Sequence, residues 1–210
     1  MTVQDHPAAG AAQLSADSFP TGQRPLRADA RLNRDRLLEA AARAFARDGT
    51  EASLKAIAQD AGVGIGTLYR HFPTREQLVE ATYRSEVART REAVPELLGS
   101  LPPAEALRAW MDRFVGFLAT KHGMADALRA ILATEDGLRL ATRQLLTDAL
   151  AELLAAGVKN RTLRSDVDPT DVLMGLGGVA LIAGQPDQRD QARRLLDLLL
   201  DGLRYGSDRQ

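Results

Sequence analysis

The chain has 210 residues, of which 45% are hydrophobic and 26% are charged, and its formal net charge is −1. These proportions are ordinary for a globular protein with one large or two small domains. The chain has no cysteine, which excludes disulfides, thiolate metal sites and cysteine nucleophiles. The longest apolar run, residues 172–184, is shorter than the roughly 20 residues that span a bilayer, and no secretory pattern is evident. We therefore expect a cytoplasmic protein with no membrane partner.

The first 28 residues predict a disordered arm, because they are rich in Pro, Gly, Ala and Ser and poor in large apolar groups. Arginines at positions 24, 27, 31 and 34 lead from this arm into the first helix. Two interpretations remain open. The arm is either a solvated polar tail or a segment that lies along the DNA minor groove, whose negative potential attracts arginine.

Residues 29–80 predict a three-helix domain with a small basic surplus. Residues 24–90 hold 12 Lys and Arg against 9 Asp and Glu, whereas the rest of the chain is acidic. Such a distribution suits a domain that approaches a polyanion. An apolar stripe of helical period indicates a first helix over about 31–48, which Gly49 ends; the stripe consists of Leu37, Leu38, Ala41, Ala44 and Phe45.

The next two predicted helices are short and are joined by a glycine turn. Ser53 is a plausible N-cap for the first of them. Gly62 lies where a helix end needs a residue that tolerates a left-handed backbone. A second helix over about 64–71 then packs through Val63, Leu68 and Phe72. This arrangement is the helix-turn-helix unit, whose second helix enters the major groove of DNA.

Thr74 and Gln77 form a capping-box pattern at the start of the following helix. We expect this helix to end at about Val94, because Pro95 should stop it. Residues 81–210 then predict an all-helical second domain, since no stretch alternates like a strand. Its helices are expected over about 103–121, 124–134, 137–156, 169–183 and 188–204, with Asp168 and Asp187 capping the last two.

Three runs of this sequence strongly resemble the TetR family of transcriptional regulators. They are RLLEAAARAFARDG (36–49), IAQDAGVGIGTLYRHF (57–72) and PTREQLVEA (73–81). The resemblance implies an all-α fold with an N-terminal helix-turn-helix DNA-binding domain and a C-terminal helical ligand-binding and dimerisation domain. It also implies a homodimer that binds a palindromic operator, usually as a repressor, and that a small apolar or amphipathic inducer releases.

The same resemblance implies which residues meet double-stranded DNA. Tyr69 and His71 match phosphate-contacting positions, and Thr67 matches a position near the backbone and base edges. Gly64 offers no capping side chain, and Ile65 is apolar where a polar residue is frequent. Apolar contact with thymine methyl groups and DNA shape should therefore contribute to sequence preference. The full predicted DNA-binding set is Lys55, Gly64, Ile65, Thr67, Tyr69, Arg70, His71 and Arg75.

Aromatic residues are concentrated in one helix of the second domain. Trp110, Phe114 and Phe117 lie within eight positions of a chain that has one Trp, three Tyr and five Phe. Such a stripe usually belongs to the core, but it also suits the wall of an apolar ligand cavity between helices. The resemblance favours the cavity. The candidate ligand pocket consists of Trp110, Met111, Phe114, Phe117, Met124 and Leu128.

The last two predicted helices carry signals of close packing and of subunit contact. Glycines at 175, 177 and 178 weaken a helix but permit close helix–helix approach. Leucines between 195 and 203 form a face wider than a single core stripe requires. The resemblance implies that a homodimer forms here, through a four-helix bundle.

No pattern in the sequence supports catalysis, a metal site or a cofactor. The three histidines, His6, His71 and His122, are dispersed, and no nucleophile motif is present. The main prediction is therefore a non-enzymatic DNA-binding regulator. The alternative is a helical small-molecule-binding or interaction protein whose DNA-binding domain no longer functions.

Overall fold

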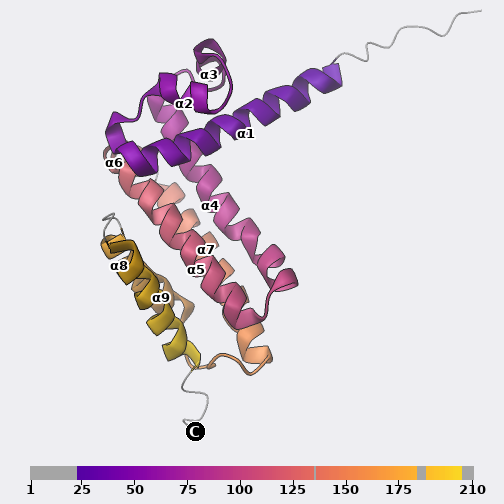
Figure 1. The fold of residues 1–210 in the computed structure, drawn as a ribbon, viewed down its shortest axis with the longest axis vertical. Helices are drawn as coiled ribbons and strands as arrows, with labels where there is room; N and C mark the ends of the chain where they lie inside the picture. Colours follow the sequence, from indigo (N-terminus) through magenta and orange to yellow (C-terminus); the bar gives the residue numbers. More distant parts are fainter. Residues whose placement is uncertain (1–22, 135, 184–187, 205–210) are drawn as a thin grey trace, which may run out of the picture.

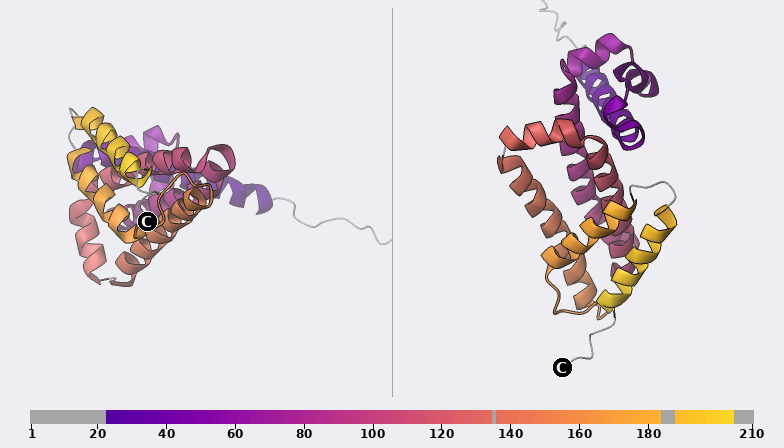
Figure 2. Two further views of the ribbon diagram at one scale, coloured as in Figure 1. Left: turned by 90° about the horizontal axis from the view of Figure 1, so that it is seen from below. Right: turned by 90° about the vertical axis from the view of Figure 1, so that its left-hand side faces the viewer.

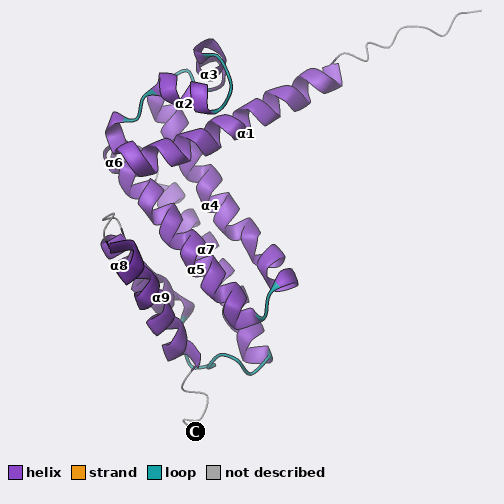
Figure 3. Cartoon of the chain, in the orientation of Figure 1, coloured by secondary structure: helices purple, strands orange, loops and turns teal. Residues whose placement is uncertain are grey.

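The computed structural model describes residues 23–134, 136–183 and 188–204, and these ranges are helical apart from short connections. Figures 1 and 3 show helices and loops, with no strand in the described ranges. This confirms the all-α fold class. The elements in chain order are α1 (Gln23–Asp48), η1 (Gly49–Glu51), α2 (Leu54–Asp60), α3 (Ile65–His71), α4 (Arg75–Ser100), α5 (Pro103–Gly123), α6 (Ala125–Thr134), α7 (Asp136–Lys159), α8 (Pro169–Ala183) and α9 (Arg189–Arg204).

The helices form two regions that α4 joins. α1, η1, α2, α3 and the first turns of α4 form one end of the molecule, which we call the head (Figure 1). The rest of α4 and α5 to α9 form the body, in which α4 packs against α5 and α7. α8 and α9 pack together along one side of α5, as the right-hand view of Figure 2 shows. No helix in the described ranges is long and apolar enough to cross a bilayer.

One hydrophobic core runs through both regions. In the head it contains Phe45 and Leu68, and in the body it continues to Leu203 near the end of α9. α4 contributes to both parts, since Leu78 and Val94 are fully buried near its two ends. Head and body are therefore packed against each other as well as being linked by α4.

Local capping signals define several helix starts, as predicted. The Ser53 hydroxyl accepts a hydrogen bond from the Ala56 N–H at 3.4 Å, and Thr74 accepts one from the Gln77 N–H at 3.2 Å. Asp168 accepts a hydrogen bond from the Thr170 N–H at 2.7 Å. These bonds satisfy N–H groups that have no partner inside the helix.

The predicted start of α1 and the predicted end of α7 differ from the structure. α1 begins at Gln23, so residues 23–28 are helical although we expected an arm there; residues 1–22 of that arm, like Asp187, lie outside the described ranges. Pro25 falls in the first turn of α1, where the missing N–H has no helical partner to lose. α7 continues past the expected end at 156, to Lys159.

Pro95 does not end α4, which corrects the predicted stop at Val94. A proline inside a helix costs about 3 kcal/mol, because it removes one backbone hydrogen bond and crowds the preceding turn. Val94 and Leu97, on either side of Pro95, are buried. Burying two such side chains contributes about 3–6 kcal/mol, which is enough to offset the cost.

Candidate DNA-binding site

The α2–α3 turn depends on a glycine with a left-handed backbone. Gly62 has a φ of +69°, and the N–H groups of Gly62 and Val63 donate to Gln59 O and Ala58 O, each at 3.0 Å. Any side chain with a Cβ is strained at such a φ. The turn therefore fixes α3 across α2, as the sequence predicted.

One face of α2 and α3 is buried and the opposite face is open. Ile57, Ala58 and Leu68 are at most 2% exposed and hold the two helices against α1. By contrast, Ile65 is 40% and Tyr69 48% exposed, although both are large. The open face of α3 therefore presents an aromatic and an aliphatic side chain to solvent, one turn of helix apart.

The predicted DNA-binding residues divide into an exposed group and a partly covered group. Thr67 and His71 are partly buried on α3. Gly64 precedes α3 and makes no side-chain capping bond, which agrees with the weak cap expected there. The exposed group consists of Lys55, Gly64, Ile65, Tyr69 and Arg70.

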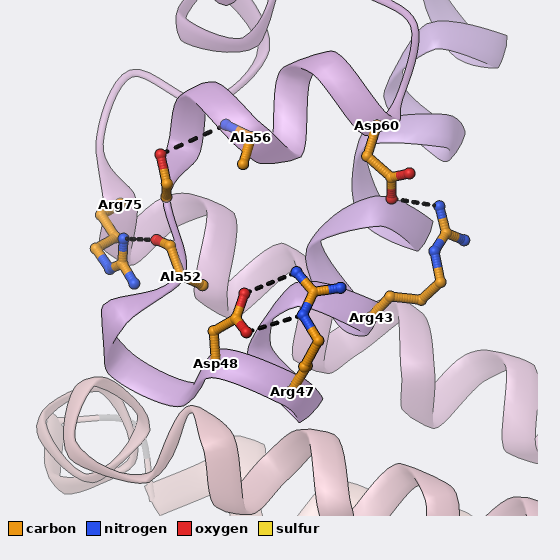
Figure 4. A network of polar contacts seen from close by, with 8 residues as sticks. Arg43, Arg47, Asp48, Ala52, Ala56, Asp60 and Arg75 are labelled. Carbon is orange, nitrogen blue, oxygen red and sulfur yellow. Dashed lines mark hydrogen bonds and ion pairs between the residues drawn. The ribbon is translucent and has the colours of Figure 1, made fainter.

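Arg75 has a structural role that the sequence did not reveal. Its guanidinium donates to Ala52 O at 2.8 Å (Figure 4). It also donates to Thr50 O at 2.7 Å. The guanidinium carbon also lies 5.5 Å from the centre of the Phe45 ring. These contacts tie the start of α4 to η1 and to the residue just before Ser53. Carbonyl acceptors belong to no side-chain pattern, so no sequence signal identifies them.

Two arginines of α1 make ion pairs at the surface of the head. Arg43 bonds Asp60 at the end of α2 at 2.8 Å, and Arg47 makes a two-point contact with Asp48 (Figure 4). The Arg47 hydrogen bond lowers the pKa of the Asp48 carboxyl. Arg34, which we considered as part of a DNA-binding arm, has its guanidinium carbon 5.6 Å from the centre of the Phe72 ring after α3.

The candidate ligand pocket in the body is a packed cluster. Trp110, Met111, Phe114, Phe117, Met124 and Leu128 are each at most 3% exposed. Trp110 and Phe114 stack with ring centres 5.4 Å apart, and the Trp110 indole N–H donates to Thr90 O of α4 at 2.8 Å. The cluster thus joins α4 to α5 as part of the core.

The outer face of α8 and α9 is apolar and open. Met174 is 63%, Leu181 70% and Leu198 68% exposed. A hollow of about 520 Å³ between the two helices has a mostly apolar lining, which includes Val172, Gly175, Val179, Leu195, Leu198 and Leu199. Exposed apolar side chains beside an apolar hollow are typical of a protein–protein contact.

Comparisons with known proteins agree with this geometry. Residues 37–82 match the model for bacterial regulatory proteins of the tetR family, and residues 102–205 match the C-terminal domain of SbtR-like transcriptional regulators. A TetR transcriptional regulator from Streptomyces coelicolor, SCO0520, is 54% identical; the match covers 81% of this chain and 98% of that one, with a TM-score of 0.77.

Two further relatives extend the comparison. The TetR transcription regulatory protein from Mycobacterium vanbaalenii is 35% identical with a TM-score of 0.69, covering 86% of this chain and all of that one. The HTH-type transcriptional repressor AcnR of Corynebacterium diphtheriae is 30% identical over 183 residues, which cover 82% of this chain and 92% of the repressor. The chain therefore belongs to the TetR family of DNA-binding transcriptional regulators.

Proposed function

We propose that the chain represses transcription as a homodimer that binds a palindromic operator. The observation that carries this proposal is the exposed surface of α3, where Ile65 and Tyr69 project beside Arg70. Tyrosine and arginine donate to phosphate oxygens, whereas Ile65 suits a thymine methyl group. A two-fold dimer would bring two such surfaces to half-sites about 34–36 Å apart, or one helical turn of DNA.

The homodimer is supported by the open apolar face of α8 and α9. Leu198 lines the hollow between these helices and is 68% exposed in a single chain. Leu198→Glu should convert the dimer to a monomer, because the new carboxylate would lose its water in the contact. Light scattering after size exclusion measures this directly. A Leu198→Glu protein that stays dimeric would place the subunit contact elsewhere.

DNA binding is tested with fluorescently labelled fragments of the flanking DNA of this gene, against random competitor, over a range of salt concentrations. Tyr69→Phe and Arg70→Gln should weaken binding to all sequences, and Arg70→Gln should lower the salt slope by about one unit. Arg143→Gln, an exposed site on α7, is the control of equal charge change. If the Tyr69 and Arg70 variants bind like the control, α3 is not the DNA-binding element.

We further propose that a small apolar or amphipathic ligand releases the operator. α4 is the element that would transmit the change, since it reaches from the head to the Trp110 cluster. A ligand entering that cluster would have to displace packed side chains, and this would alter Trp110 fluorescence. Screening a ligand panel for joint changes in Trp110 emission and operator affinity tests the proposal. A ligand that releases the operator without altering Trp110 emission would contradict the placement in this cluster.

A further inference from the structure

A second hollow lies where the head meets the body. It has a volume of about 1060 Å³, and its walls come from α1 and η1 on one side and from α9 on the other, with α5 between them. Cavities of roughly 300–1,000 Å³ hold typical small ligands. α9 lines it through Ala192, Arg193 and Leu196, a different face from the one that carries Leu198. The subunit contact proposed above would therefore leave this hollow accessible.

Three arginines line this hollow, and each of them pairs with a carboxylate that lies outside the lining. Arg43 and Arg47 of α1 and Arg193 of α9 all lie on its walls. Among the described lining residues the one carboxylate is that of Asp112, and Arg108 already pairs with it at 2.6 Å.

The arginines on the walls have hydrogen-bond donors to spare. Arg43 donates one hydrogen bond to Asp60 through Nη2, and Arg193 donates a long one of 3.3 Å to Asp190. A guanidinium carries five N–H donors, so each arginine has others available. Both side chains are more than half exposed, and exposed ion pairs contribute little free energy. Both arginines can therefore turn toward an anion that lies between them, because breaking their present ion pairs costs little free energy.

Apart from His122, the rest of the lining consists of apolar residues and glycines. Ala46 of α1, Val115 and Ala119 of α5 and Leu196 of α9 all contribute. Gly116 also lines the hollow, and a Cβ built there would meet nothing within 4 Å. The hollow therefore has a mostly apolar floor, with Arg43 on one side and Arg193 on the other.

We propose that this hollow binds a small organic anion with an apolar body, whose carboxylate, sulfonate or phosphate is held between Arg43 and Arg193. The apolar body lies on Val115, Ala119 and Leu196. This site is separate from the Trp110 cluster and does not depend on DNA binding. Its occupant would bridge the head and the body of one subunit.

The test is titration of the full-length protein with 1-anilinonaphthalene-8-sulfonate, which joins a sulfonate to an aromatic body and fluoresces when desolvated. Arg43→Gln combined with Arg193→Gln should weaken binding about tenfold or more, because charge-assisted hydrogen bonds are lost. The control is Arg143→Gln combined with Arg161→Gln, which removes equal charge from exposed sites outside the hollow. Ala119→Trp should abolish binding at this site by filling it.

Two further measurements separate this site from non-specific apolar binding. The neutral analogue N-phenyl-1-naphthylamine should bind with the same affinity to the wild type and to the Arg43/Arg193 variant. In the wild type, NMR signals of the Arg43 and Arg193 side-chain Nε–H groups should shift with the sulfonate, and those of Arg143 should not. The proposal is overturned if the sulfonate binds the Arg43/Arg193 variant as it binds the control, or if Ala119→Trp leaves binding unchanged.

Discussion

Gly123, the last residue of α5, allows the backbones of head and body to meet. A Cβ at this position would overlap the carbonyl oxygen of Phe45 in α1 and would lie 2.7 Å from its carbonyl carbon. Because both atoms belong to the backbone, no side-chain rotation can relieve the overlap. Gly123→Ala must therefore push α1 away from α5, between two helices that otherwise pack closely.

We expect Gly123→Ala to lower the free energy of unfolding by about 3 kcal/mol, the upper end of the range for overpacked sites. For a chain of this length, that corresponds to a fall in Tm of roughly 6–12 °C. The matched control is Gly116→Ala on the same helix. Position 116 has open space around a new Cβ, so helix propensity alone should stabilise that variant by about 0.5–1 kcal/mol.

Urea denaturation followed by circular dichroism measures both variants. All samples have the same protomer concentration, because the proposed dimer would unfold in a concentration-dependent way. The two substitutions are chemically identical and are predicted to act with opposite signs. Equal midpoints for Gly123→Ala and the wild type would refute the close backbone contact between α1 and α5.

Further predictions concern single residues of the head and of α4. Arg75→Gln should lower the free energy of unfolding by about 2 kcal/mol, since it loses charge-assisted bonds to Ala52 O and Thr50 O and the contact with the Phe45 ring; Arg70→Gln should leave it within about 0.5 kcal/mol of the wild type in the same urea assay. Burial raises the pKa of Glu86, although Arg89 opposes this shift and Glu39 adds to it. The folded state therefore holds the Glu86 proton more tightly than the unfolded state, so the contribution of Glu86 to stability is present in acid and lost as pH rises through its raised pKa. Glu86→Gln should accordingly be more stable than the wild type at pH 7, and this gain should vanish below the ordinary pKa range of glutamate. Urea midpoints of both proteins at several pH values measure the difference. A difference that did not depend on pH would contradict the reasoning.

Features determined by neighbouring residues were predictable from the sequence. The starts of α2 and α4 follow from Ser53 and Thr74, whose hydroxyls bond N–H groups three residues ahead. The turn at Gly62 follows from its need for a positive φ. Such interactions lie within one helical turn, so a single sequence contains both partners side by side.

Features that depend on distant partners were missed. Pro95 remains inside α4 because burial of its neighbours outweighs the local penalty, and no local pattern measures that burial. Arg75 bonds carbonyls more than twenty residues away. The close approach of Gly123 to Phe45 joins residues far apart in the chain, whereas the sequence drew attention to the glycines of α8.

The Trp110 cluster shows why composition alone leaves a core and a cavity indistinguishable. Both need aromatic side chains at helical spacing. They differ in whether neighbouring helices fill the space, and here Thr90 O accepts the indole N–H while Phe114 stacks on the ring. The neighbouring helix that fills the space comes from tertiary packing, and the spacing of residues along one helix gives no information about it.

The continuity of α4 has a consequence for engineering hybrid regulators. To build a hybrid, one would join the head of one family member to the body of another near residue 80, the domain boundary predicted from the sequence. That junction cuts α4 between Val79 and Tyr83, both buried in the shared core. A chimera made there would pair one parent's α1 with the other parent's α4 and α5. If the parent that supplies the body has a side chain at the position of Gly123, that side chain would overlap the backbone at the position of Phe45.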